Sequence, residues 1–178
     1  MKIYILSCAV ALAVLAASCS KSKTDSGTNN PPPGNNSFTT SIDGSTYTAS
    51  IIKVTTYAGN PSTGVQPSIS IRGVSDKSDF DLMVLLTNGK LVAGTYPLSF
   101  GSDGHYHAEL TYFIDLNAGS TSNNAFDSAN MPDDQQPGTI TVTKADDHHA
   151  EGTFSGKICN YNRTITKTVA NGKFSINF

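Results

Sequence analysis

Apolar and polar side chains alternate with a period of two residues in several segments of this chain. The segment 80–86 (FDLMVLL) has large apolar side chains at every second position, and so does the segment 174–178 (FSINF). Successive side chains of an extended strand point to opposite faces of a sheet, so each segment predicts a strand with one buried face. No segment combines a sustained helical apolar period with a capping residue at its start. The pattern therefore predicts strands throughout.

Turn signals separate these alternating segments. Asn-Gly and Asp-Gly pairs favour tight hairpin turns, because their residues tolerate positive φ angles. Asp43-Gly44 and Asn88-Gly89 predict such turns, and Asn171-Gly172 predicts a hairpin that pairs residues 164–169 with residues 173–178. With the other alternating segments, they predict an all-β fold of about nine or ten short strands, either an antiparallel β-sandwich or an open barrel.

The chain before residue 38 has a different composition. Lys2 precedes an uncharged apolar stretch over residues 3–15, shorter than the roughly 20 residues that a membrane-spanning helix needs. This pattern is typical of a secretory signal peptide. Residues 20–37 (SKSKTDSGTNNPPPGNNS) contain no large apolar side chain, so they cannot offset the entropy cost of ordering. We expect a signal peptide over residues 1–18, a disordered tether over 19–37 and a single all-β domain over 38–178.

The end of the apolar stretch, Leu15-Ala16-Ala17-Ser18-Cys19, resembles the lipobox of bacterial lipoproteins. The resemblance implies cleavage before Cys19, diacylglycerol on its thiol and a further acyl chain such as palmitate on the new amino terminus. Because a single acyl chain binds a membrane only marginally, more than one chain makes a durable anchor. The resemblance predicts a lipid-anchored protein of the bacterial cell envelope. The outer membrane is favoured, since Ser20 and not an aspartate follows Cys19. The alternative is an ordinary signal peptide with an incidental cysteine.

Several segments of the domain resemble a family of small, uncharacterised lipoproteins of Bacteroidota-type bacteria. They are FTTSIDGSTYTAS, GTYPLSF, GTITVTKADDHHAEGTFSGKI and VANGKFSINF. The resemblance covers nearly the whole of residues 38–178 and depends on turns and threonine-rich strands. Tyr47 stands where such proteins often have a tryptophan. The family implies a single β-sandwich-like domain in a cell-envelope lipoprotein. It brings no catalytic residues to transfer and leaves the ligand open.

The four histidines are candidate metal ligands. His105 and His107 alternate, and His148 and His149 are adjacent in a second polar segment. Four imidazoles could bind zinc if the two segments met. However, neighbouring residues of a strand point to opposite faces, so His148 and His149 would diverge. Exposed polar histidines are the favoured interpretation.

The carboxylates offer two further candidates. Asp127, Asp133 and Asp134 lie in a long irregular connection whose oxygen atoms could hold calcium, but the alternating aspartate pattern of a calcium loop is missing. Glu109 and Glu151 lie in strand-like segments. A glycosidase needs two carboxylates facing each other across a cleft, and nothing in their spacing identifies such a pair. We therefore expect no metal and no other cofactor.

Two side chains are candidates for covalent chemistry. Asp127-Ser128-Ala129 resembles the short acceptor for O-glycosylation of exported proteins in Bacteroidota-type cells, which makes Ser128 a possible modification site. Cys159 has no disulfide partner within the chain if Cys8 leaves with the signal peptide and Cys19 is lipidated. A buried free thiol is the favoured interpretation of Cys159.

The sequence carries no recognisable catalytic or phosphate-binding motif. Its 12 basic and 14 acidic side chains form no basic patch, so we expect no nucleic-acid partner. The favoured function is a non-enzymatic binding or structural accessory domain on a lipid anchor, whose ligand or protein partner is open. The alternative is a small carbohydrate-active or other hydrolytic lipoprotein, in which exposed tyrosines would stack on sugars. The candidates for that role are Tyr57, Tyr106, Tyr112 and Tyr161.

Overall fold

The computed structural model describes residues 36–60, 62–100, 104, 107–121, 123–132, 135 and 137–178. The signal peptide and nearly all of the tether that the sequence predicts lie outside these residues. Within them the chain forms eleven strands, two short 3-10 helices and no α-helix, which confirms the all-β prediction. The strands are β1 (Ser37–Ile42), β2 (Ser45–Thr48), β3 (Ile51–Tyr57), β4 (Ser68–Ser75), β5 (Ser78–Leu85), β6 (Gly94–Pro97), β7 (Ala108–Phe113), β8 (Ala125–Asp127), β9 (Gly138–Ala145), β10 (His149–Asn160) and β11 (Thr166–Asn177), and the 3-10 helices are η1 (Leu116–Ala118) and η2 (Ser128–Asn130).

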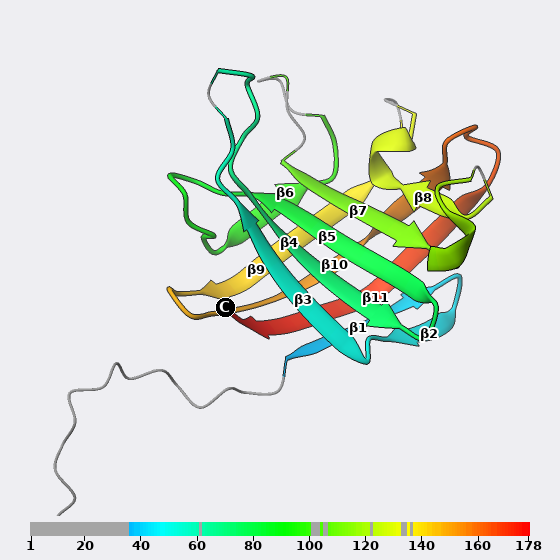
Figure 1. Ribbon diagram of the computed structural model, residues 1–178, viewed down its shortest axis with the longest axis horizontal. Coiled ribbons are helices and arrows are strands. Elements are labelled where there is room, and N and C mark those ends of the chain that lie inside the picture. The colour runs from blue at the N-terminus through cyan, green and yellow to red at the C-terminus, as the bar shows by residue number, and fades with distance from the viewer. Residues whose placement is uncertain are drawn as a thin grey trace, which may run out of the picture.

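All eleven strands join one antiparallel sheet that curls into a half-barrel (Figure 1). The strand order is β2-β1-β11-β10-β8-β7-β5-β4-β3, with β9 added to β10 and β6 added to β9. One edge of β10 pairs with β11, and the other edge pairs with β9 and, at its end, with β8. Figure 1 shows the result of this branching: β3, β4 and β5 cross in front of β9, β10 and β11. The half-barrel therefore has two facing layers, a front layer that includes β3, β4 and β5 and a back layer that includes β9, β10 and β11.

Apolar side chains from both layers meet between them. Phe38 of β1, Phe80 of β5 and Phe154 of β10 pack around one another, with ring centroids 5.3 to 5.8 Å apart. Each side chain is no more than 3% exposed. Large buried aromatic rings contribute much of the apolar area that a core removes from water. This cluster holds the front layer against the back layer.

Two predicted turns are present. Asp43-Gly44 joins β1 to β2 with φ angles of 50° and 83°. Asn88-Gly89 has φ angles of 52° and 76° and closes an isolated bridge between Thr87 and Lys90. Positive φ at both central residues is what Asn-Gly and Asp-Gly pairs accept most easily. The second turn reverses the chain beyond the end of β5.

The hairpin predicted at Asn171-Gly172 is wrong. β11 continues through this pair from Thr166 to Asn177, although Asn171 has a φ angle of 55°. The register of β11 with both of its neighbours shifts beside the pair, between Thr39 and Ser41 of β1 and between Phe154 and Gly156 of β10. A bulge absorbs one extra residue while pairing continues on both sides. Positive φ therefore serves a bulge here and not a turn.

Two glycines make room for two aromatic rings beside this bulge. Gly152 of β10 lies opposite Phe174 of β11, and Phe154 lies opposite Gly172. A Cβ atom on either glycine would collide with the opposing ring. Each phenylalanine therefore covers the glycine across from it. The expectation of a buried face on the last strand is right for Phe174 and Ile176, but Phe178 is 44% exposed.

Candidate functional site

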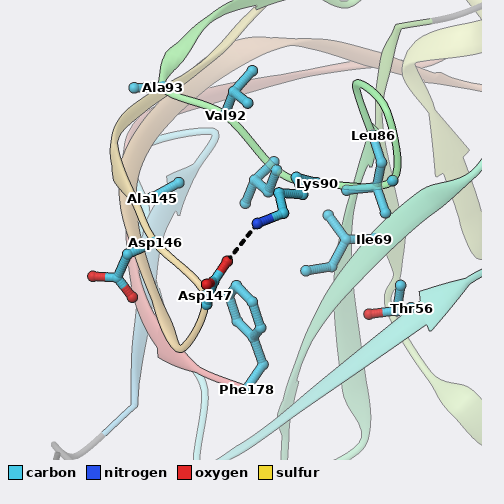
Figure 2. A pocket seen from close by; sticks show the side chains of 12 residues that line it. Thr56, Ile69, Leu86, Lys90, Val92, Ala93, Ala145, Asp146, Asp147 and Phe178 are labelled. Carbon is cyan, nitrogen blue, oxygen red and sulfur yellow. Dashed lines mark hydrogen bonds and ion pairs between the residues drawn. The ribbon is translucent and has the colours of Figure 1, made fainter.

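A cleft of about 500 Å³ opens between the two layers at one end of the half-barrel (Figure 2). Thr56 of β3 and Ile69 of β4 form one side of it. The segment 86–93, the β9–β10 turn at residues 145–147 and Phe178 form the rest. Its volume lies within the range of about 300–1,000 Å³ that is usual for small-molecule sites.

The wall formed by residues 86–93 follows from the local sequence. The Asn88-Gly89 turn brings Lys90 back to Thr87, and the two residues exchange backbone hydrogen bonds of 2.9 and 3.1 Å. Leu91 is then 9% exposed and belongs to the core cluster. The Tyr96 hydroxyl donates a 2.7 Å hydrogen bond to the carbonyl oxygen of Val92. These contacts hold the segment in place. In the described part of the chain, the segment does not pair with β5.

Most side chains that line the cleft are apolar, and Thr56, Lys90, Asp146 and Asp147 add polar groups to its surface. Ile69, which is 2% exposed, faces the cavity from β4, whereas Val92 and Phe178 at the opening are 41% and 44% exposed. Figure 2 shows the Phe178 ring pointing into the cleft. The apolar side chains of the lining are those of Ile69, Leu86, Leu91, Val92, Ala93, Ala145 and Phe178.

One ion pair spans the opening. Lys90 Nζ lies 2.9 Å from Asp147 Oδ1, and the two side chains are 71% and 74% exposed. Figure 2 shows this pair above the Phe178 ring. The hydrogen bond from Lys90 lowers the pKa of Asp147. Asp146 points away from the pair, because its carboxylate accepts the backbone N–H groups of His148 and His149.

A second polar feature lies on the opposite face of the front layer from the core. Asp81 of β5, Glu109 of β7 and Asp127 of β8 occupy neighbouring strands there. Burial raises the pKa of Asp81 to about 6, against a 2.8 Å hydrogen bond donated by Ser70. Burial, a hydrogen bond with Asp127 and the charges of both aspartates raise the pKa of Glu109 to about 8.

In this carboxyl cluster, Glu109 and Asp127 share a proton. With its raised pKa, Glu109 keeps a proton at neutral pH and donates it in a hydrogen bond to Asp127. Asp127 also accepts a 3.1 Å hydrogen bond from the Thr111 hydroxyl and a 2.7 Å bond from the backbone N–H of Ala129. Glycosidase carboxyls stand about 5–10 Å apart with the scissile bond between them. The Glu109 and Asp127 carboxyls are within hydrogen-bonding reach of each other, so their spacing does not match that of a glycosidase pair.

The candidate glycosylation site lies at the edge of this cluster. Ser128, the first residue of η2, is 2% exposed. Its Oγ accepts a 3.0 Å hydrogen bond from the backbone N–H of Leu110. An enzyme that modifies Ser128 therefore has to act before the domain folds or during a local opening. Modification of Ser128 stays a prediction, and Cys19 lies outside the described residues.

The histidines are not brought together in the part of the chain that the structure describes. His149 Nε2 lies 2.7 Å from Glu151 Oε1 and its Nδ1 lies 3.0 Å from Asn177 Oδ1. The hydrogen bond with Glu151 raises the pKa of His149. His148 is exposed in the preceding turn, and His105 lies outside the described residues. Among the described side chains, no group of three or more His, Cys, Asp or Glu residues could hold a metal ion.

The remaining sequence candidates are scattered. Cys159 is 1% exposed with a free thiol, and burial raises its pKa, as expected for a structural thiol. Tyr112 packs against Phe80. Tyr57 and Tyr161 are 52% and 79% exposed, on β3 and after β10 respectively. Tyr106, Asp133 and Asp134 lie outside the described residues.

The cleft itself was missed by sequence reasoning. Its only signal was the short apolar run Leu91-Val92-Ala93 after a turn, which lacks the alternation of a strand. No helix in the described part of the chain is long and apolar enough to cross a membrane. No protein-family model, curated protein or solved structure matches this chain. The function therefore has to be inferred from the geometry of the cleft.

Proposed function

We propose that this protein is a lipid-anchored protein of the bacterial cell envelope, on the outer membrane, and that its β domain is a non-enzymatic binding module for an apolar ligand. The lipobox-like segment ending at Cys19 supports the anchor. The observation that carries the binding role is the cleft of about 500 Å³ at the end of the half-barrel, most of whose lining side chains are apolar.

The cleft favours binding because most of its lining side chains are apolar and its walls are held in place before a ligand arrives. Removing apolar surface from water contributes about 25 cal/mol per Å². Ile69 and Ala145 belong to paired strands, and Tyr96 ties down the segment that carries Val92. A preformed cavity avoids part of the ordering cost that weakens binding. A compact apolar ligand would therefore keep much of the energy that its burial provides.

The position where the chain leaves the domain supports the same function. Asn36 Oδ1 accepts hydrogen bonds of 2.8 and 3.1 Å from the backbone and side-chain N–H groups of Asn177. The next residue, Phe178, lines the cleft. If residues 20–35 form the tether that the sequence predicts, they would span about 20–25 Å on average. Anchoring at Cys19 would thus keep the cleft close to the membrane surface.

The anchor is tested by Cys19→Ala. The wild type should take up a palmitate analogue and sediment with membranes, whereas the variant should do neither, because the lipid is the proposed membrane contact. Equal membrane retention of both proteins would contradict the anchor.

The binding role is tested with the uncharged fluorescent probe N-phenyl-1-naphthylamine. Val92→Glu places a charge at the cleft opening and should weaken probe binding at least about tenfold, since burying an unpaired charge is costly. Val65→Glu is the matched control, because Val65 is also exposed, at 56%, and lies outside the cleft lining. Equal binding by the two variants would place the probe elsewhere and contradict the proposed function.

A further inference from the structure

The walls of the cleft indicate the shape of the apolar part of a ligand. Apart from Phe178, every apolar side chain of the lining is aliphatic. Aromatic rings pair favourably with other aromatic rings, and Phe178 is the single aromatic side chain among the described lining residues. Aliphatic walls contact a chain of methylene groups equally well at every position along it. The cleft thus fits an alkyl chain.

The ion pair at the opening indicates the polar part of the same ligand. Lys90 and Asp147 are both largely exposed, and an exposed ion pair contributes little to stability, so it opens at low cost. An anionic head group would pair with Lys90 but would lie beside the Asp147 carboxylate. A cationic head group would have the reverse problem. A head group with both charges satisfies Lys90 and Asp147 together.

We propose that the cleft binds an acyl chain of a zwitterionic phospholipid from the membrane to which the protein is anchored. The chain lies against Ile69 and Phe178, the phosphate pairs with Lys90, and the ammonium group of a phosphoethanolamine head pairs with Asp147. This inference rests on the proposed function and names the ligand class for the same site. The hydrogen bonds between Asn36 and Asn177 support this inference. They place Asn36, the residue at which the predicted tether meets the domain, next to Phe178 at the cleft.

Photo-crosslinking of the full-length protein tests this inference. The protein is reconstituted in phosphatidylglycerol vesicles that contain one of three probes with a diazirine at the end of the same acyl chain. The probes are lysophosphatidylethanolamine, lysophosphatidylglycerol and the free fatty acid. The ethanolamine probe should label peptides containing residues 86–93 or 145–147 about two- to fivefold more than either other probe, which is the size expected of one additional exposed ion pair.

Asp147→Asn should remove this preference while leaving total labelling of the cleft by the fatty acid unchanged or higher, because the carboxylate that repels an anion is gone. Asp76→Asn is the matched control, since Asp76 is an exposed aspartate in the β4–β5 turn, away from the cleft lining, and it should keep the preference. Equal labelling of the wild type by the three probes, or labelling spread over other peptides, would overturn the inference.

The outcomes also separate this inference from the proposed function. Binding of N-phenyl-1-naphthylamine that depends on Val92, without any head-group preference, would overturn the lipid assignment and leave the binding module standing. If the wild type does not bind N-phenyl-1-naphthylamine, or if Val92→Glu and Val65→Glu bind it equally well, the proposed function itself is overturned. Retention of Cys19→Ala in the membrane fraction would overturn the anchor.

Discussion

At the scale of single residues, Glu109 has the most unusual environment in the described chain. It is a carboxyl group largely removed from water, hydrogen-bonded to Asp127 and facing the charge of Asp81. Arg72 approaches the same face from β4, but its guanidinium pairs with Asp79. Glu109 therefore experiences mainly negative neighbours, and a proton is the cheapest way to neutralise it.

This environment makes stability depend on pH. The pKa of Glu109 rises from 4.5 in the unfolded chain to about 8 in the folded domain, so the folded state holds a proton that the unfolded state releases. The bound proton of Glu109 contributes to the free energy of unfolding. This contribution is fully present below pH 4.5 and is lost as the pH rises through about 8. Asp81, with a pKa raised to about 6, acts in the same direction over a lower range.

We predict that Glu109→Gln unfolds at nearly the same urea concentration as the wild type at pH 5 and at a clearly higher concentration at pH 9. A glutamine amide donates to Asp127 at every pH, whereas the glutamate must lose its proton. The difference at pH 9 should be roughly 2–4 kcal/mol, after allowance for solvent screening. Parallel stability curves between pH 5 and 9 would contradict the shared proton.

Ser128 carries the second prediction at this scale. Intact-mass spectrometry of the protein from its native host should show a glycan that Ser128→Ala removes. Because the Ser128 hydroxyl is buried and bonded to Leu110, the folded domain should not accept the glycan when it is incubated with a native membrane extract. An unmodified wild-type mass would end the idea.

At the scale of elements, β11 holds the back layer together. It pairs with β1 along one edge and with β10 along the other, and its inner face carries Phe174 and Ile176. Phe178 lies beyond its last paired residue and is 44% exposed. Two phenylalanines four residues apart therefore differ sharply in burial.

We predict that Phe174→Ala lowers the free energy of unfolding by about 3–5 kcal/mol, the usual cost of truncating a buried phenylalanine. Phe178→Ala is the matched control and should cost less than about 1 kcal/mol, because much of its ring already meets water. Deletion of residues 173–178 should prevent folding, since it removes pairing with both neighbours. Thermal unfolding measures all three. A deletion that melts like the parent would show that β11 is peripheral.

At the scale of the whole molecule, the predicted tether and the sheet meet at Asn36. Asn36 bonds to Asn177, and Ser37 already pairs with Ser175. The sequence placed the boundary between tether and domain after Ser37. The contacts of Asn36 and Ser37 with β11 show that the domain begins at least at Asn36. Residues 20–35 contain no large apolar side chain that could add to the core.

We predict that deleting residues 20–35 leaves the thermal midpoint within about 1 °C of the parent, because these residues have no large apolar side chain that could pack in the core. Extending the deletion through Ser37 should lower the midpoint by several degrees, since it removes the Asn36 hydrogen bonds and the first pair of β1. Differential scanning calorimetry compares the two. Equal midpoints would show that Asn36 and Ser37 add nothing to the sheet.

The strands and some of their turns could be predicted from the order of the residues alone. Alternation at residues 80–86 predicted β5 because side-chain direction in a strand is a local property of the backbone. Asp43-Gly44 predicted a turn for the same local reason. The sequence also predicted a buried thiol at Cys159 and a buried face at Phe174.

Features that depend on residues distant in the sequence became apparent only in the folded domain. Asn171-Gly172 accepts positive φ in a turn or in a bulge, and the choice of a bulge followed from pairing with β1 and β10 on both sides. The raised pKa of Glu109 depends on Asp81 and Asp127 from neighbouring strands. The cleft needs Lys90 and Asp147, which are 57 residues apart in sequence, to meet across its opening. Periodicity encodes which way a side chain points, but what it meets depends on how the sheet closes.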